Sequence, residues 1–143
     1  MFYAIDEDRQ AALFRVVSAK VSEHQWEFYT NTCDRLLSDR AGPSNITIIL
    51  SEPGSDVPHA KWRQRFADIG ARAKPDAVFV LVTQSTIARG VLTAVNWIRP
   101  FRFHYAAVPQ LDEALTLADG WRPGEGVYQV FSALRGRLSP VPR

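Results

Sequence analysis

The chain contains few side chains able to act as nucleophiles, general bases or metal ligands, and these lie far apart in the sequence. Its three histidines fall in an early helix, at a helix start and in a strand: His24, His59 and His104. No HxxxH, CxxC or nucleophile-elbow spacing connects them with one another or with Cys33. The glycines form neither GxGxxG nor GxxxxGK, the patterns of dinucleotide and phosphate loops. The sequence therefore predicts a protein that is not an enzyme and that uses no cofactor or metal.

Positive charge is concentrated in the middle of the chain. Residues 1–56 carry nine acidic and five basic side chains, whereas residues 57–111 carry two acidic and eight basic ones. Such asymmetry is typical of an anion-facing surface, although solvated helix faces also produce it. Seven of the cations form the candidate anion or partner surface: Lys61, Arg63, Arg65, Arg72, Arg89, Arg99 and Arg102. We expect an acidic protein partner or a small anionic ligand at this surface, and no nucleic acid.

Aromatic side chains are interleaved with these cations. Trp62, Trp97, Phe101 and Tyr105 fit such a surface, but most of them are more simply explained as core residues. The exception is the segment 99–102 (RPFR), where we expect apolar and cationic groups to be exposed together.

Composition limits the class of protein. A chain of 143 residues with 46% hydrophobic and 22% charged residues is typical of one globular domain with a single core. The lone cysteine excludes an internal disulfide and indicates a reducing cytoplasm. The first ten residues lack a basic segment, and no apolar run approaches the roughly 20 residues that cross a bilayer. We therefore expect a cytoplasmic protein that is not an integral membrane protein.

Hydrophobic spacing predicts an α/β fold. Short β-branched runs predict strands at residues 2–5, 12–17, 45–50, 77–83 and 103–108. Apolar residues at three- and four-residue spacing predict helices at residues 22–37, 58–73, 85–97 and 110–118. Right-handed crossovers then require parallel central strands, so strands 45–50 and 77–83 should be neighbours. Beyond a main domain at residues 1–120, residues 121–143 are expected to form an extension with a short helix near 127–134 and a disordered last six residues.

The order of these elements, over most of residues 2–118, resembles that of a STAS domain, the module of the bacterial anti-sigma-factor antagonists. The segment TQSTIARGVL at residues 83–92 and the segment QLDEAL at residues 110–115 carry most of the resemblance. Tryptophan-containing helices and the WIRP segment at residues 97–100 are similar to the SpoIIAA-like subgroup, which is grouped with CRAL-TRIO-type lipid binders. The resemblance implies a STAS/SpoIIAA-like mixed sheet of four or five strands with helices packed against it.

The resemblance also implies a site for regulation by phosphorylation. The family carries an aspartate-serine-serine-glycine motif at the start of the helix after the central strand, and a serine of that motif is phosphorylated. Here the sequence is GSDVP at residues 54–58, so the motif is absent and Ser55 is its nearest equivalent. A phosphate on Ser55 would meet the partial positive charge of a helix start and Lys61. The simpler interpretation is that Ser55 or Asp56 caps that helix.

Two functions are compatible with these observations. The first is a non-catalytic STAS-like regulatory module that docks a protein partner, with a homodimer as one form. The second is a CRAL-TRIO-like carrier of a lipid or another amphipathic anion. A carrier needs a cavity of several hundred Å³ lined by apolar side chains with a few polar anchors, so pocket volume should distinguish the two.

Overall fold

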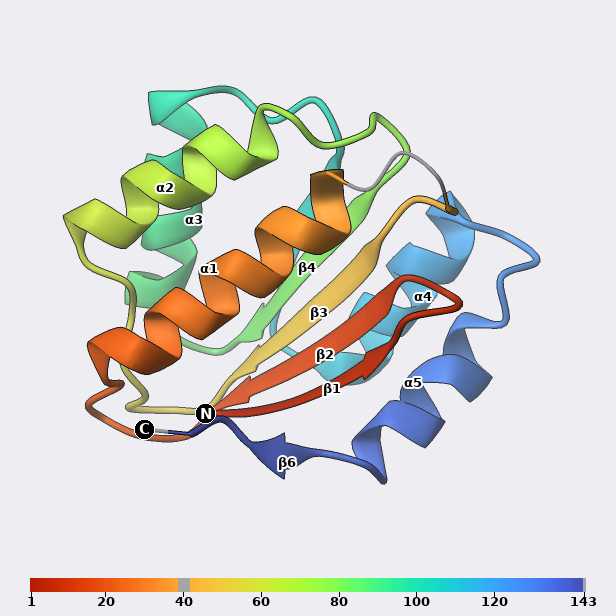
Figure 1. Cartoon of the computed structure of the whole chain (residues 1–143), viewed down its shortest axis with the longest axis horizontal. Coiled ribbons are helices and arrows are strands. Elements are labelled where there is room, and N and C mark those ends of the chain that lie inside the picture. The colour runs from red at the N-terminus through yellow and green to blue at the C-terminus, as the bar shows by residue number, and fades with distance from the viewer. Residues whose placement is uncertain (39–41, 143) are drawn as a thin grey trace.

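A mixed sheet of six strands lies between two layers of helices (Figure 1). The computed structural model describes residues 1–38 and 42–142. Along the sheet the strand order is β5-β4-β3-β2-β1-β6. The α/β class predicted from hydrophobic spacing is therefore confirmed, whereas the predicted strand number of four or five is too small.

Five of the strands lie where the sequence predicts them. β1 (Phe2–Asp6) and β2 (Ala11–Val16) form an antiparallel hairpin. From β2 onward the pairing is parallel, through β3 (Ile46–Ser51), β4 (Val78–Thr83) and β5 (His104–Val108). The predicted parallel pairing of the two central strands is thus confirmed. Many α/β folds share this pairing, so the STAS resemblance itself stays a prediction.

Three helices cover one face of the sheet, and two cover the other (Figure 1). The first layer holds α1 (Glu23–Ser38), α2 (Ala60–Gly70) and α3 (Thr86–Ile98). The second holds α4 (Leu111–Trp121) and α5 (Val127–Arg135). α1 begins with a capping box, because Ser22 Oγ accepts a hydrogen bond from Gln25 N at 3.1 Å and Gln25 Oε1 accepts one from Ser22 N at 3.2 Å. Ser85 Oγ caps α3 by accepting from Ala88 N at 3.2 Å.

The start of α2 differs from the sequence expectation. A helix from residue 58 capped by Ser55 or Asp56 was predicted, but α2 begins at Ala60 and His59 is its N-cap residue. The reason is that Asp56 has other partners: its carboxylate accepts from Val21 N at 2.9 Å and from Val57 N at 3.0 Å. Asp56 therefore ties the loop before α2 to the loop before α1.

The end of the chain closes the sheet rather than trailing away from it. α5 packs against β1 and β2 on the same core as α4. Beyond α5, β6 (Ser139–Pro140) pairs with Phe2 and Tyr3 of β1. Val141 is only 2% exposed, and its N–H donates to Met1 O at 2.9 Å. Proline and arginine content predicted disorder for the last six residues, whereas burial of Val141 holds this segment against β1 and adds the sixth strand.

Candidate functional site

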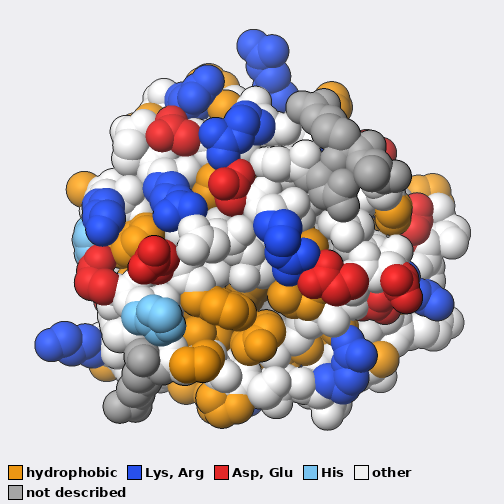
Figure 2. Space-filling model, viewed as in Figure 1, with side chains coloured by type: hydrophobic (Ala, Val, Ile, Leu, Met, Phe, Trp, Pro, Cys, Tyr) orange, Lys and Arg blue, Asp and Glu red, His pale blue; other side chains and the backbone are white. Residues whose placement is uncertain are grey.

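The predicted cations of α2 face the acidic side of α1. Lys61 Nζ lies 3.8 Å from Glu23 Oε2, and Arg72 Nη2, just beyond α2, lies 2.7 Å from Asp34 Oδ1. Arg65 donates to Asn31 Oδ1. Figure 2 shows positive and negative side chains intermixed over α1 and α2. Much of the predicted basic surface is therefore matched by α1, because the acidic first part of the chain folds against the basic middle part.

The carboxylates of this helix pair are held in their charged forms. A hydrogen bond with His59, at 2.7 Å, is the main reason that the pKa of Glu23 lies below its ordinary value. Partial burial acts to raise the pKa of Asp34, but hydrogen bonds from Arg72 and Ser38 outweigh it and keep that pKa below the ordinary value. Both carboxylates therefore remain negative near neutral pH and compensate the cations opposite them.

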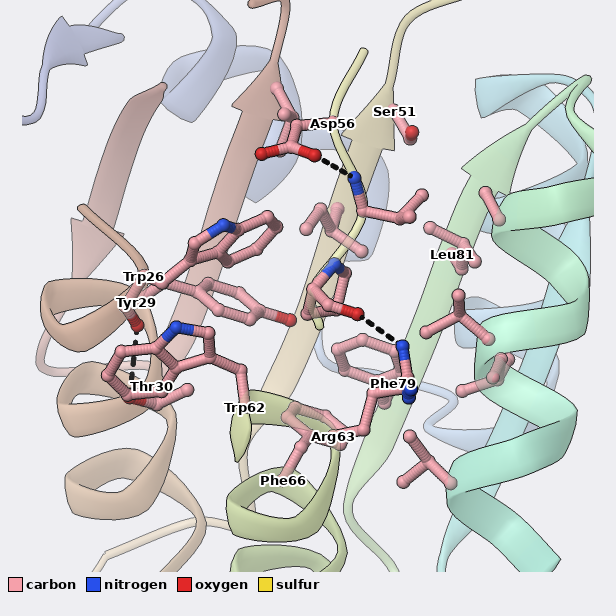
Figure 3. Close-up of a pocket in the computed structure, with 18 residues that line it drawn as sticks. Trp26, Tyr29, Thr30, Ser51, Asp56, Trp62, Arg63, Phe66, Phe79 and Leu81 are labelled. Atoms are coloured by element: carbon pink, nitrogen blue, oxygen red, sulfur yellow. Dashed lines mark hydrogen bonds between the residues drawn. The ribbon is translucent and has the colours of Figure 1, made fainter. Parts of the chain in front are cut away.

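Arg63 is the one predicted cation of α2 that turns toward the interior. Its Nη1 donates to Pro58 O at 3.0 Å, and the side chain lines a cavity beneath α1, α2 and α3 (Figure 3). Four aromatic rings from α1 and α2 line this cavity (Figure 3): Trp26, Tyr29, Trp62 and Phe66. The cavity has a volume of about 70 Å³. This is well below the roughly 300–1,000 Å³ of typical ligand pockets.

A second apolar surface, which we call the α3 face, lies on the outer side of α3. It comprises residues of α3 together with one residue of β5, whose ring packs on Phe101 just beyond α3: Ile87, Gly90, Ala94, Trp97, Ile98 and Tyr105. Trp97 is 80% exposed and Ile87 is 70% exposed. The sequence placed Val91 and Ile98 on the core side of this helix, but Ile98 is 42% exposed.

α3 has two apolar stripes, and the sheet covers only one of them. Ala88, Leu92 and Val95 are buried against the core. The stripe at positions 87, 94 and 98 lies beside the first one around the helix and reaches the surface, whereas Val91 still packs against the core. The stripe stays uncovered because α3 packs on α2 and β4 near the edge of the sheet, which ends at β5.

Several contacts fix the chain where it leaves α3 and leads into β5. Asn96 Oδ1 accepts a hydrogen bond from Phe101 N at 2.8 Å, which fixes the chain as it leaves α3. The rings of Phe101 and Tyr105 meet edge to face with centroids 4.8 Å apart. Phe101 also packs against Phe103 at 4.9 Å. These contacts hold the segment between α3 and β5 in place at one end of the α3 face.

The segment that forms the α3 face carries only positive charge. Residues 77–111 contain three arginines, Arg89, Arg99 and Arg102, and no aspartate or glutamate. All three arginines are exposed, as the sequence predicted for Arg89 and for segment 99–102. Arg99 Nη1 lies 3.4 Å from Asp68 Oδ1 of α2, whereas Arg89 and Arg102 have no ion-pair partner in the described residues. Here, and not along α2, positive charge stands next to exposed apolar side chains.

A shallow groove of about 640 Å³ runs between α1 and the hairpin edge. Figure 2 shows hydrophobic side chains gathered in this region, and the groove is lined by Tyr3, Ile5 and Phe28, each only partly exposed. Two of the charged side chains at its rim form an ion pair, because Arg35 Nη1 lies 2.7 Å from Glu7 Oε2. A third, Arg137, donates to the backbone carbonyl of Ile5 at 2.9 Å.

Ser55, the candidate phosphorylation site, lies in the loop between β3 and α2. Its hydroxyl is 3.0 Å from the hydroxyl of Ser51, and its N–H donates to Glu52 O at 3.0 Å. The side chain is partly buried and lies outside the first turn of α2. The resemblance implied that a phosphate on Ser55 would lie at the positively charged start of a helix. Because α2 begins at Ala60, Ser55 lies before that start.

Local contacts account for two of the three histidines and for the cysteine. His59 pairs with Glu23, and the His104 ring stacks on Trp121 with centroids 5.1 Å apart. Burial raises the pKa of Cys33 to about 12, so the thiol is a core residue. Across residues 1–38 and 42–142, no group of three His, Cys, Asp or Glu side chains is placed to hold a metal ion.

None of the helices within the described residues is both long and apolar enough to cross a membrane. The sequence matches no protein-family model, and neither a curated protein nor a solved structure matches it.

Proposed function

We propose that the protein is a non-catalytic, STAS-like interaction module that docks a partner protein through the α3 face. The observation that carries this proposal is the 80% exposure of Trp97 on a helix whose other side is firmly packed. Tryptophan is costly to leave in water and is enriched, together with arginine, among the residues that dominate binding energy at protein interfaces. An exposed tryptophan with isoleucines on both sides along one helix is therefore best explained by a partner that covers it.

Neither of the two hollows described above suits a carrier of lipids. The groove of about 640 Å³ between α1 and the hairpin is shallow and open to solvent, so it encloses little of a ligand's surface. The cavity of about 70 Å³ beneath α1, α2 and α3 would hold a few water-sized groups, whereas a lipid carrier encloses most of its ligand's surface. Its walls are rings from α1 and α2 that already contact one another, such as Tyr29 and Phe66 with centroids 6.2 Å apart. A carrier function would need these two helices to separate.

Site-specific photo-crosslinking in the cells that make the protein tests this function. A photo-reactive amino acid is placed at Trp97 and, as a matched control, at the exposed Gln129 of α5 on the other face of the sheet. We expect position 97 to yield a discrete crosslinked protein, and position 129 to yield none. Equal crosslinking at both positions would contradict docking through the α3 face.

Native mass spectrometry of the purified protein tests the carrier function separately. A carrier would retain a small molecule of reproducible mass, whereas an interaction module gives the mass of the chain alone or of a protein complex. A bound small-molecule mass would overturn the proposed function, whatever the crosslinking shows.

A further inference from the structure

We infer that the partner segment docked on the α3 face is an acidic amphipathic helix. The inference rests on the proposed function and specifies the chemistry of the partner. It follows from three properties of the α3 face: its charge, its length and its flat centre.

The charge of the surface selects an acidic partner. Arg89 and Arg102 are exposed without an ion-pair partner in the described residues, and no carboxylate side chain occurs anywhere in residues 77–111. By contrast, the cations Lys61 and Arg72 near α2 already face Glu23 and Asp34. Carboxylates on a partner would therefore gain most from the uncompensated positive charge at the α3 face.

The length and shape of the α3 face match a helix. Ile87 and Ile98 are eleven positions apart along α3, which corresponds to about 16 Å or three helical turns. Between them lies Gly90, where an added Cβ would meet no atom within 4 Å, followed by the small side chain of Ala94. Large side chains at both ends and small ones in the centre leave a shallow depression, which a second helix can approach closely.

A second copy of the chain fits this surface less well. A two-fold interface brings the same patch of both subunits together. Arg89, Arg99 and Arg102 would then face the same three cations of the other copy, with no acidic residue of the patch between them. Like charges placed opposite one another oppose association, so the surface favours a different, acidic chain.

An anionic membrane also attracts tryptophan, isoleucine and arginine. The flat centre at Gly90 and Ala94 argues for a helix instead, because a lipid surface is bound by apolar side chains that protrude along the whole contact. The exposed residues of the α3 face protrude mainly at its two ends.

Designed peptides supply the probe, because they can be made without identifying the natural partner. One fluorescent peptide of about 15 residues carries leucine at three- and four-residue spacing with glutamate on both flanks. A second carries lysine in place of glutamate, and a third has the acidic composition in scrambled order. We expect the acidic amphipathic peptide to bind roughly tenfold or more tightly than either control in fluorescence anisotropy. Its affinity should fall several-fold as salt rises past about 0.1 M.

Matched variants locate the binding. Trp97→Ala should weaken acidic-peptide binding roughly tenfold, and Arg89→Glu with Arg102→Glu should invert the preference toward the basic peptide. Arg135→Glu, on the exposed side of α5, should change neither the affinity for the acidic peptide nor the preference between the peptides. Circular dichroism and thermal unfolding of each variant separate lost binding from lost folding.

Several outcomes would overturn the inference. Equal binding of acidic and basic peptides, or acidic binding that survives Trp97→Ala, excludes an acidic helix at this face. If the protein sediments with phosphatidylserine vesicles, loses this binding in Trp97→Ala and shows no preference between the peptides, the α3 face binds membranes instead. If analytical ultracentrifugation shows a dimer of the parent protein and a monomer of Trp97→Ala, the α3 face binds a second copy of the chain instead. If crosslinking at position 97 captures a protein while the peptides show no preference, the proposed function stands and only the partner class is wrong.

Discussion

Arg72 Nη2 lies 2.7 Å from Asp34 Oδ1, and this ion pair joins the end of α2 to α1. It is one of the closest contacts by which the acidic first part of the chain compensates the basic middle part. Because its two side chains are about half exposed, its net effect on stability should be below about 1 kcal/mol.

The first prediction concerns the pH dependence of this pair. Since the pKa of Asp34 is lowered in the folded state, the pair stabilises the fold at neutral pH and loses this effect as pH falls below about 3.9, the ordinary value in an unfolded chain. Arg72→Ala should raise the pKa of Asp34 and reduce this acid-dependent loss. A carboxyl-carbon NMR titration measures the pKa directly, with Arg102→Ala as control. An unchanged pKa of Asp34 in Arg72→Ala would assign the effect to Ser38 instead.

The second prediction concerns Arg122 at the end of α4, which is only 8% exposed. Its Nη1 donates to Ser44 O at 2.9 Å and to Asp76 O at 3.2 Å. One guanidinium therefore provides hydrogen bonds to a backbone carbonyl just before β3 and to another just before β4. Arg122→Met should lower the free energy of unfolding by about 2–4 kcal/mol, because it leaves these carbonyls without a donor. Urea unfolding measures the loss.

The exposed Arg89→Ala is the control for that experiment, and its melting temperature should stay within a few degrees of the parent protein. Arg122→Lys should give an intermediate loss, since an ammonium keeps the charge but lacks the planar fork. A loss in Arg122→Met no larger than that in Arg89→Ala would show that water replaces the guanidinium.

Most of the fold could be predicted from local sequence. Ser22 and Gln25 marked the start of α1, and β-branched runs between turn residues marked β3 and β4. These features act over a few residues, so one sequence is enough to identify them. The same reasoning placed α3 and the burial of Ala88, but it also assigned Ile98 to the buried face, and Ile98 is 42% exposed. How far the sheet extends beneath α3 decides that exposure, and this depends on β5 being the edge strand.

Two further features depend on residues that are distant in sequence. Arg72 and Asp34 meet only because α1 and α2 pack side by side, and nothing in either helix alone specifies that contact. The burial of Val141 depends on a space beside Met1 at the other end of the chain. Prolines on both sides of Val141 indicated disorder, and the single buried side chain between them outweighs that local preference.

The third prediction tests the environment of Cys33. Burial raises its pKa to about 12, so almost none of the thiol is ionised at pH 8, and the side chain is 1% exposed. We expect a disulfide reagent to leave the native protein unmodified at pH 8 and to modify it fully in denaturant. Fast modification of the native protein would show that the helix α1 opens locally.

The fourth prediction tests the contribution of the C-terminal strand. Val141→Ala should lower the free energy of unfolding by about 1–2 kcal/mol, because it removes buried methyl groups next to the core. Ser139→Ala, at an exposed position of β6, is the matched control and should stay within about 0.5 kcal/mol. Equal stability of both variants would mean that the end of the chain contributes nothing to the fold.

The pairing of Phe2 with Pro140 has a consequence during protein synthesis. β1 leaves the ribosome before the other strands, whereas α5, which packs against β1, and β6, which pairs with its outer edge, are made after them. Until those residues are made, the nascent hairpin presents a free strand edge and an uncovered apolar face, the combination that leads to aggregation. A messenger RNA that is truncated after the codons of α4 would therefore release a chain that contains most of the helices. In that chain the outer edge of β1 would still be free to pair with a strand of another chain.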